Sequence, residues 1–286
     1  QKGIDIAFAA GGAEVWVGSG VYTNTTAILI KSGVKLYGGY NPATWVRNIS
    51  TNVSEIQDTT TATSNIFTAS SVTNPIVIDG FKISFVNLSA ASVTRNIMNL
   101  SVSASVTVAN NDMTSPNSNN STHNGIIVSG AAGHLIYNNI LRIKSNAGDT
   151  RYSYGINTSA QTDIYNNVIY TADSTVNGGS GINSTHRDVR IRNNTIIFYN
   201  GYQGINLAAG ATGSTSIENN IIYSPVAGGT CIFAASATQK PVSVANNDMF
   251  NCATNYYLEA ATPYSFAIIG TAGFTTSTGN QQYDMV

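Results

Sequence analysis

One short phrase recurs through the chain and constrains its fold more than any other feature. The phrase is an aliphatic residue, one variable residue and then a pair of asparagines. It occurs six times, ending in Asn110-Asn111, Asn138-Asn139, Asn166-Asn167, Asn193-Asn194, Asn219-Asn220 and Asn246-Asn247. The steps from one pair to the next are 28, 28, 27, 26 and 27 residues. A fixed period of this size is typical of stacked structural repeats, each burying its apolar face against its neighbours.

The residues around each pair indicate two short strands joined by a bend. Apolar and polar residues alternate before the pair, and an aliphatic residue follows it at a fixed offset: Met113, Leu141, Ile169, Ile196, Ile222 and Met249. We expect the second Asn of each pair to take the left-handed backbone conformation, which Asn tolerates best after Gly. The first Asn would then point inward. There it would form a ladder of amide hydrogen bonds with its equivalents about 4.8 Å above and below.

A second ladder predicts a third strand in each repeat. It reads Gly125-Ile126, Gly155-Ile156, Gly181-Ile182, Gly204-Ile205 and Cys231-Ile232. Three short strands and three turns in about 27 residues predict a single-stranded parallel β-helix.

At this level the chain resembles the right-handed parallel β-helix proteins of the pectin-lyase-like superfamily. The likeness lies in the coil architecture and the Asn ladder, and it covers nearly the whole chain. The stretch from Ala13 to Tyr40, with its phrase Leu36-Tyr37-Gly38-Gly39-Tyr40, is similar to the first coil of uncharacterised bacterial surface β-helix proteins. The resemblance implies an all-β, right-handed solenoid that is secreted or displayed at a cell surface, in bacteria by this likeness.

We expect one β-helix domain over residues 1–286. The apolar run Ile4–Ala10 is stopped by Gly11-Gly12, which predicts a short helix that caps the raw edge of the first coil within residues 1–12. The coils would occupy residues 13–250, and residues 251–286 would form the last coil or a C-terminal cap.

Charged residues make up only 9% of the chain, against about 25% in an average protein. The formal net charge of −1 gives no electrostatic reason to expect nucleic acid or an anionic membrane as a partner. The chain contains no run of 18 apolar residues, so the sequence predicts no membrane-spanning helix. The start at Gln1, without Met, suits a processed secreted protein. Cys231 and Cys252 are 21 residues apart, and both a disulfide and two free thiols remain open.

If the coils stack in register, outward residues at equivalent positions form columns, and each column can be examined for binding or catalytic groups. Before the Asn pair, we expect Arg192 to contact Tyr165 or Glu218, and Asp163 to lie near Arg190. On the third strand the outward column reads Ile127, Asn157, Asn183, Asn206 and Phe233. The resemblance implies that in polysaccharide lyases this sheet forms the substrate groove, with acidic calcium ligands and a basic catalytic residue. In this chain the outward column of the third strand has neither an acidic nor a basic residue.

Catalytic candidates are therefore restricted to loops. The chain has no Asp-Asp pair of the kind that the related polygalacturonases use, although glycoside hydrolysis needs two carboxyl groups about 5–9.5 Å apart. The remaining weak candidates are Asp149, Asp173, His186 and Asp188. His123 and His134 are isolated, so we expect them to be solvated or capping, and no zinc site is indicated.

Three functional hypotheses follow. The first is a non-catalytic extracellular module for adhesion, surface structure or glycan binding, without cofactor or metal. A polysaccharide or surface glycan would lie on Asn157, Asn183, Asn206, Tyr170, Tyr199, Tyr202 and Tyr223. The second is a carbohydrate-active enzyme, a lyase or glycoside hydrolase, that uses loop residues and calcium. The third is a structural subunit that associates with itself through its exposed rungs.

Overall fold

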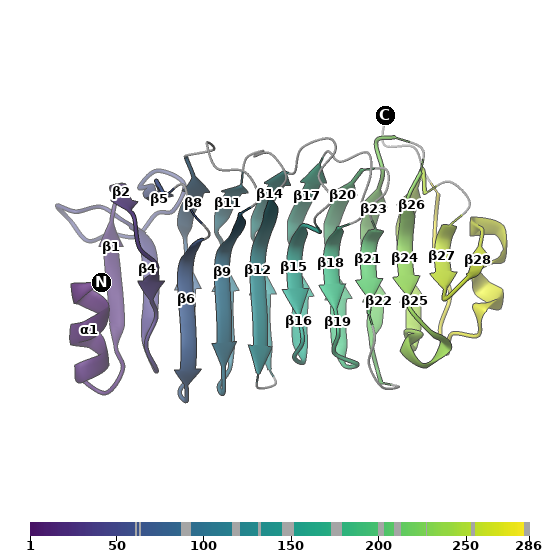
Figure 1. The fold of residues 1–286 in the computed structure, drawn as a ribbon, viewed down its shortest axis with the longest axis horizontal. Helices are drawn as coiled ribbons and strands as arrows, with labels where there is room; N and C mark the ends of the chain where they lie inside the picture. The colour runs from purple at the N-terminus through teal and green to yellow at the C-terminus, as the bar shows by residue number, and fades with distance from the viewer. Residues whose placement is uncertain are drawn as a thin grey trace.

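The protein is a right-handed parallel β-helix, seen from the side in Figure 1 as a row of strands stacked along one long axis. The computed structural model describes residues 1–60, 62, 64–86, 93–115, 121–130, 133–144, 152–172, 179–199, 203–208, 213–226, 228–252 and 255–282. Within these ranges each coil contributes one strand to each of three sheets, which we name A, B and C.

Sheet A carries the strands that precede the Asn pairs. In spatial order its strands are β1 (Glu14–Gly18), β4 (Lys35–Tyr40), β7 (Ile76–Asp79), β10 (Val106–Ala109), β13 (His134–Tyr137), β16 (Thr162–Tyr165), β19 (Val189–Arg192), β22 (Ser216–Glu218) and β25 (Ser243–Ala245).

Sheet B carries the strands that follow the pairs. Its order is β2 (Gly20–Asn24), β5 (Ser54–Asp58), β8 (Phe81–Phe85), β11 (Asp112–Ser115), β14 (Ile140–Lys144), β17 (Val168–Ala172), β20 (Thr195–Phe198), β23 (Ile221–Tyr223) and β26 (Asp248–Phe250).

Sheet C carries the Gly-Ile strands that the sequence predicts. Its order from the N-terminal end is β3 (Ile28–Leu29), β6 (Ser64–Val72), β9 (Thr94–Val102), β12 (Thr122–Gly130), β15 (Tyr154–Thr158), β18 (Ser180–Ser184), β21 (Gln203–Leu207), β24 (Thr230–Ala234), β27 (Asn255–Glu259) and β28 (Thr262–Tyr264). The β27–β28 pair is antiparallel, whereas the other pairs of described strands are parallel.

The core consists of inward columns in strict register. Ile136, Ile164 and Ile191 pair in sequence along sheet A, and all three are completely buried. The glycine that precedes Ile in β12, β15, β18 and β21 is required by close approach of two coils. A Cβ atom on Gly155 would lie 2.5 Å from both the Gly181 carbonyl oxygen and the Ile169 side chain, too close for any other residue.

The Asn pairs form the predicted ladder, but our assignment of the two residues was wrong. The first Asn of every pair has the left-handed conformation, with φ of 55–57°, and the second Asn is buried. Asn167 shows the pattern: its amide donates to Asn194 Oδ1 at 3.0 Å and to the carbonyl of Ile136 at 2.9 Å, and its Oδ1 accepts from the Asn139 backbone at 3.0 Å. The left-handed step breaks the in–out alternation, so the residue after it turns inward.

The ladder runs beyond the six pairs. Asn111 Oδ1 accepts from the Phe81 backbone at one end, and Asn247 donates to Asn280 at the other. Gly279, with φ of 68°, takes the left-handed position before Asn280, so Gly279-Asn280 is a seventh version of the motif.

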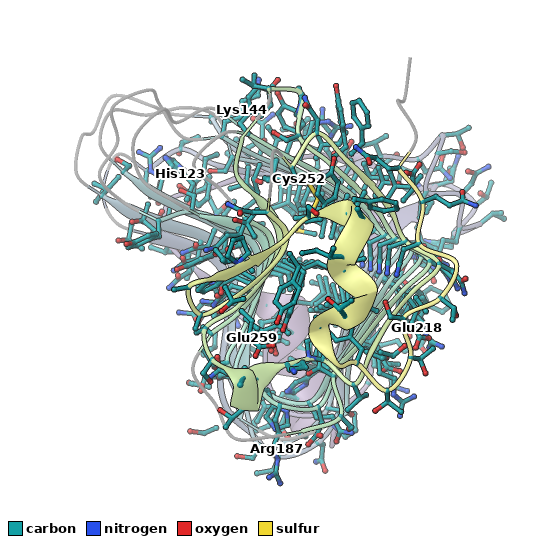
Figure 2. The ribbon with its side chains drawn as sticks, turned by 90° about the vertical axis from the view of Figure 1, so that its right-hand side faces the viewer. His123, Lys144, Arg187, Glu218, Cys252 and Glu259 are labelled. Atoms are coloured by element: carbon teal, nitrogen blue, oxygen red, sulfur yellow. A yellow bond between two sulfur atoms is a disulfide. The ribbon has the colours of Figure 1, made fainter. Side chains whose placement is uncertain are left out.

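The two ends of the solenoid are covered differently. At the C-terminal end, β28, the 3₁₀ helix η2 (Phe266–Ala272) and residues 276 and 281 pack over the last coils, and η2 crosses the interior in Figure 2. A second 3₁₀ helix, η1, spans Ala237–Gln239. At the N-terminal end, the predicted helix α1 (Lys2–Ala9) buries Ile4 and Ala7.

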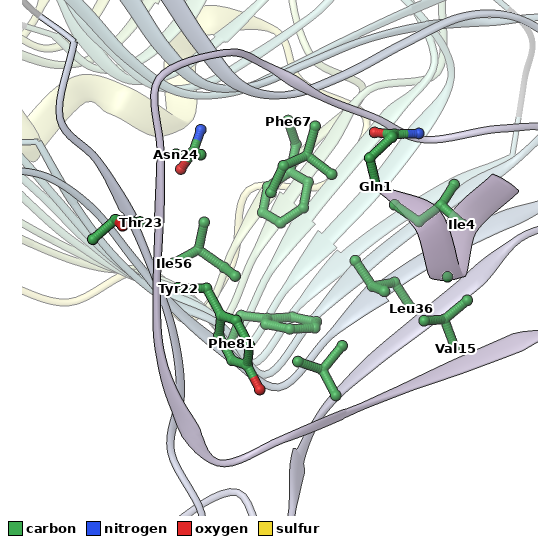
Figure 3. A pocket seen from close by; sticks show the side chains of 13 residues that line it. Gln1, Ile4, Val15, Tyr22, Thr23, Asn24, Leu36, Ile56, Phe67 and Phe81 are labelled. Atoms are coloured by element: carbon green, nitrogen blue, oxygen red, sulfur yellow. The ribbon is translucent and has the colours of Figure 1, made fainter.

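Next to α1 the N-terminal end remains hollow. A cavity of about 370 Å³ opens there, lined mainly by apolar side chains that include Ile4, Leu36, Ile56, Phe67 and Phe81 (Figure 3). Apart from Ile4 of α1, these are core residues of the first coils, so the hollow is the open end of the solenoid interior.

Cys231 and Cys252 form a disulfide, which resolves the open question in favour of a bond. Their Cα atoms are 5.5 Å apart, within the ordinary range for a disulfide. The bond joins β24 to the segment after β26, near the covered C-terminal end (Figure 2). None of the helices in the described ranges has the length and apolar character needed to cross a bilayer.

Candidate functional site

The outer face of sheet C carries the uncharged polar column that the sequence predicts. Ile127, Asn157, Asn183, Asn206 and Phe233 pair one after another along β12 to β24. Asn183 donates its amide to Asn157 Oδ1 at 2.8 Å. The Oδ1 atoms of Asn183 and Asn206 are enclosed and have no hydrogen-bond partner among the described residues. This column therefore holds amide acceptors that the rest of the described fold does not use.

A second polar column runs beside it, and sequence reasoning missed it. Asn96 donates to Asn65 Oδ1 and Asn124 donates to Asn96 Oδ1, each at 2.7 Å. Tyr154, Ser180 and Gln203 continue this column toward the C-terminal end. The available signal was the residue before each Gly-Ile, which is polar in β12, β15, β18 and β21.

The two columns meet at a cleft of about 290 Å³ over β15, β18 and β21. Tyr152, Tyr154, Gly179, Ser180, Gln203 and Asn206 line it. The Ser180 hydroxyl donates to Gln203 Oε1 at 3.3 Å, and burial raises the pKa of Tyr154. Tyr152 is exposed. The cleft thus combines aromatic faces with uncharged donors and acceptors, the groups that recognise sugar rings and their hydroxyls.

The tyrosines of the predicted binding set lie elsewhere. Tyr170 and Tyr223 are on sheet B, and Tyr199 directly follows β20. The Tyr170 and Tyr199 hydroxyls are 3.3 Å apart, with rings in edge contact, and Tyr223 stacks on Phe250. Tyr202 lies outside the described residues. Asn157, Asn183 and Asn206 are on sheet C, so the structure divides the predicted set between two sheets.

The described catalytic candidates, His186 and Asp188, lie in the turn between β18 and β19, where His186 also lines a hollow of about 10 Å³. The Asp188 carboxylate accepts from the Ser214 hydroxyl at 2.8 Å and from its backbone at 3.0 Å, and these bonds lower the pKa of Asp188. His186 Nδ1 accepts from the Asp188 backbone at 3.0 Å. His186 is therefore bonded within the turn between β18 and β19, whereas Asp188 is bonded to Ser214, which precedes β22 in the next coil. Asp149 and Asp173 lie outside the described residues.

The histidines of sheets A and C are buried, so of the two roles that we expected, solvated or capping, the solvated one is wrong. His134 Nδ1 accepts from the Val106 backbone at 3.1 Å, and His123 Nδ1 lies 2.6 Å from the Ser115 hydroxyl. Burial, with the nearby Arg95 charge, lowers the pKa of His123 to about 4. Isolated histidines looked like surface residues because the local pattern does not show which side of a strand faces the core.

The charges of sheet A pair as predicted. Arg192 lies over the Tyr165 ring at 5.1 Å, and Arg190 is 3.6 Å from Asp163. Arg192 also lies 3.6 Å from Asp163, whereas Glu218 is its register neighbour on the next strand. Within the described part of the chain, no cluster of three or more His, Cys, Asp or Glu residues could hold a metal ion.

No protein-family model and no curated protein sequence matches the chain. Two solved structures with a similar fold are the A-modules of the mannuronan C-5 epimerases AlgE6 and AlgE4 from Azotobacter vinelandii. They are 12% and 14% identical, align with 100% and 99% of this chain and 94% of each of theirs, and both have a TM-score of 0.32. Tailspike protein 3 of bacteriophage CBA120 is 11% identical over 98% of this chain and 56% of its own, with a TM-score of 0.24. With TM-scores this low, we draw no conclusion about this chain from them.

Proposed function

We propose that this protein is a non-catalytic, extracellular glycan-binding β-helix module of the pectin-lyase-like type. The single observation that carries the proposal is the sheet C cleft, where Tyr152 and Tyr154 stand beside Gln203 and Asn206. Tyrosine rings stack on the C–H faces of pyranose rings, and amides donate to and accept from sugar hydroxyls. The columns on either side of the cleft continue the polar surface along the solenoid axis, which suits an extended chain of sugars.

The chemistry of the cleft supports binding over bond cleavage. The amides do not act as acids or bases near neutral pH, and burial raises the pKa of Tyr154, whereas glycosidic cleavage needs a carboxyl pair and uronate elimination needs a base. The strands β9, β12, β15, β18, β21 and β24 contain no Asp or Glu.

The disulfide supports an extracellular location. Disulfide bonds persist in oxidising compartments such as the cell exterior and the bacterial periplasm. Cys231–Cys252 is such a bond, and secretion or surface display is the location that we propose. The low content of charged residues, with Ser, Thr and Asn in their place, suits the same location.

The test is a binding and turnover assay on neutral and acidic polysaccharides, with and without calcium. We expect binding by calorimetry without release of reducing ends or unsaturated products. Tyr152→Ala and Gln203→Ala should each weaken binding about tenfold, which corresponds to about 1.4 kcal/mol. Gln161→Ala, an exposed glutamine outside the cleft, is the matched control and should bind normally.

Two results would contradict the proposal. Product release by the wild-type protein would show that it is an enzyme. Binding that is equally strong in Tyr152→Ala, Gln203→Ala and wild type would place the glycan away from this cleft.

A further inference from the structure

Both tryptophans of the chain lie at one place, far along the solenoid from the sheet C cleft. Trp16 is on β1 and Trp45 is in the loop between β4 and β5, with 49% and 50% of their surfaces exposed. Together with Glu14 they line an open cleft of about 380 Å³. Tyr40 on β4 packs behind them: its ring stacks on Trp16 at 4.9 Å and lies 6.2 Å from Trp45, tilted by 49°.

The loop that carries Trp45 is held firmly in place. Asn41 Oδ1 accepts from the backbones of Ala43 and Thr44 at 2.9 and 3.1 Å, and the Trp45 backbone donates to the Asn41 carbonyl at 2.8 Å. Arg47 anchors the returning strand, because it donates to the Gly38 carbonyl at 2.9 Å and pairs with Asp79. Such a loop presents its side chains with little ordering cost on binding.

Trp45 itself has a backbone conformation that a bulky residue rarely adopts. Its φ is 55°, in the left-handed region that favours Gly and Asn. Strained residues of this kind persist where the surrounding structure enforces them, often at ligand sites. Here the conformation holds a half-exposed indole in the cleft that Trp16 also lines, where a residue selected for the turn alone would be Gly or Asn.

Glu14 gives the cleft a hydrogen-bonding group and a charge. Its carboxylate accepts from Trp16 Nε1 at 2.9 Å, which fixes the plane of that indole ring. The other carboxylate oxygen has no partner among the described residues. A carboxylate is a strong acceptor for sugar hydroxyls, and its charge repels a uronate carboxylate placed against it, although Lys35 is its register neighbour on β4.

We propose that Trp16, Trp45 and Glu14 form a second binding site, which takes one pyranose ring of a neutral glycan. The ring stacks on indole faces and donates a hydroxyl to Glu14. A quaternary ammonium ion fits less well because it needs aromatic walls on several sides. Trp16 and Tyr40 are nearly parallel, with 10° between their planes, so they act as one wall, and Trp45 adds one more. The site is on sheet A and does not depend on the sheet C cleft.

The tryptophan count provides a direct test, since all tryptophan fluorescence of the protein comes from this cleft. The probes are hexamers of β-1,4-glucose, α-1,4-glucose, β-1,4-xylose and β-1,4-mannose, and a hexamer of α-1,4-galacturonate. We expect at least one neutral hexamer to change the emission saturably and the galacturonate to bind at least tenfold more weakly. Glu14→Gln should reduce the difference in affinity between the neutral hexamer and the galacturonate hexamer. Trp45→Gly, which relieves the backbone strain, should abolish the Trp16 response while circular dichroism shows an intact fold.

The controls separate this site from the one in the proposed function. Tyr152→Ala should leave the fluorescence response unchanged. No saturable response to any neutral hexamer, a response to tetramethylammonium alone, or a response lost in Tyr152→Ala would each overturn the inference. None of these results tests the glycan site proposed on sheet C, which has its own binding assay.

Discussion

At the scale of single residues, the Asn pair gives two adjacent identical side chains opposite roles. Asn166 is exposed and holds the left-handed turn, whereas Asn167 is buried and bonds to the coils on both sides of its own. The first position needs a backbone conformation, which Gly also supplies at position 279. The second position needs an amide, because its neighbours each lose a partner if it is removed.

We therefore expect Asn167→Leu and Asn166→Gly to differ sharply. Asn167→Leu should lower the free energy of unfolding by about 1–3 kcal/mol, the cost of leaving buried amides unpaired. Asn166→Gly keeps the left-handed turn at no steric cost and should change it by less than about 0.5 kcal/mol. Urea denaturation of both variants makes the comparison, and equal effects would contradict the assignment of the two roles.

His123 predicts a pH dependence of stability. Its pKa is about 4 in the folded protein because burial and the Arg95 charge disfavour the protonated ring, against an ordinary value of 6.5 when unfolded. The negative charge that acts on Arg95 is that of Asp58. Between these two pH values only the unfolded chain binds the proton. Stability from this residue is therefore present above about pH 6.5 and is lost as the pH falls toward 4.

The expected loss from His123 between pH 7 and about pH 4.5 is about 2–3 kcal/mol. His123→Gln removes this titration but keeps a polar group beside Ser115. Urea denaturation at the two pH values should show a smaller drop in the variant than in the wild type. A drop of the same size in both proteins would show that other groups cause the acid sensitivity.

At the scale of strands and turns, the sequence was most informative where a short pattern repeats. The Gly-Ile phrases predicted the strands of sheet C because close coil contact and core packing each restrict one residue type. The direction of each Asn side chain could not be read in the same way. The alternation of apolar and polar residues before the pair is the same whether the first or the second Asn is left-handed. Only the residues after the pair distinguish these two assignments.

The candidate sites were harder to predict than the strands, for a topological reason. Gln203 and Tyr154 lie 49 residues apart in sequence but line one cleft, because each coil brings the residue before its glycine to the same edge. Trp45 reaches Trp16 only through a loop whose path depends on the Arg47–Asp79 pair. The sequence contains no repeat around Trp45 that would show where this loop returns.

At the scale of the whole molecule, the two ends of the solenoid differ in a way that bears on association. β1, β2 and β3 are the edge strands of their sheets, and their outer edges at the N-terminal end have no strand paired to them in the described structure. Unpaired edges are templates for further strands from another chain. Helix α1 covers part of this end, and its buried residue Ile4 lines the hollow in Figure 3.

We expect α1 to protect the N-terminal end against self-association, and two isoleucines of the helix can test this. Ile4 is buried against the first coil, whereas Ile6 is 61% exposed. Ile4→Asp places a charge in the apolar hollow and should lower the free energy of unfolding by about 2–4 kcal/mol, because an unpaired carboxylate is costly to bury. Displacement of the helix would then expose the edges of β1 and β3, so light scattering should show oligomers whose fraction rises with protein concentration.

The control is Ile6→Asp, which adds the same charge to the same helix. It should leave the free energy of unfolding and the monomeric molar mass measured by light scattering unchanged. A monomeric, destabilised Ile4→Asp protein would show that the helix stabilises the first coil without guarding its edge.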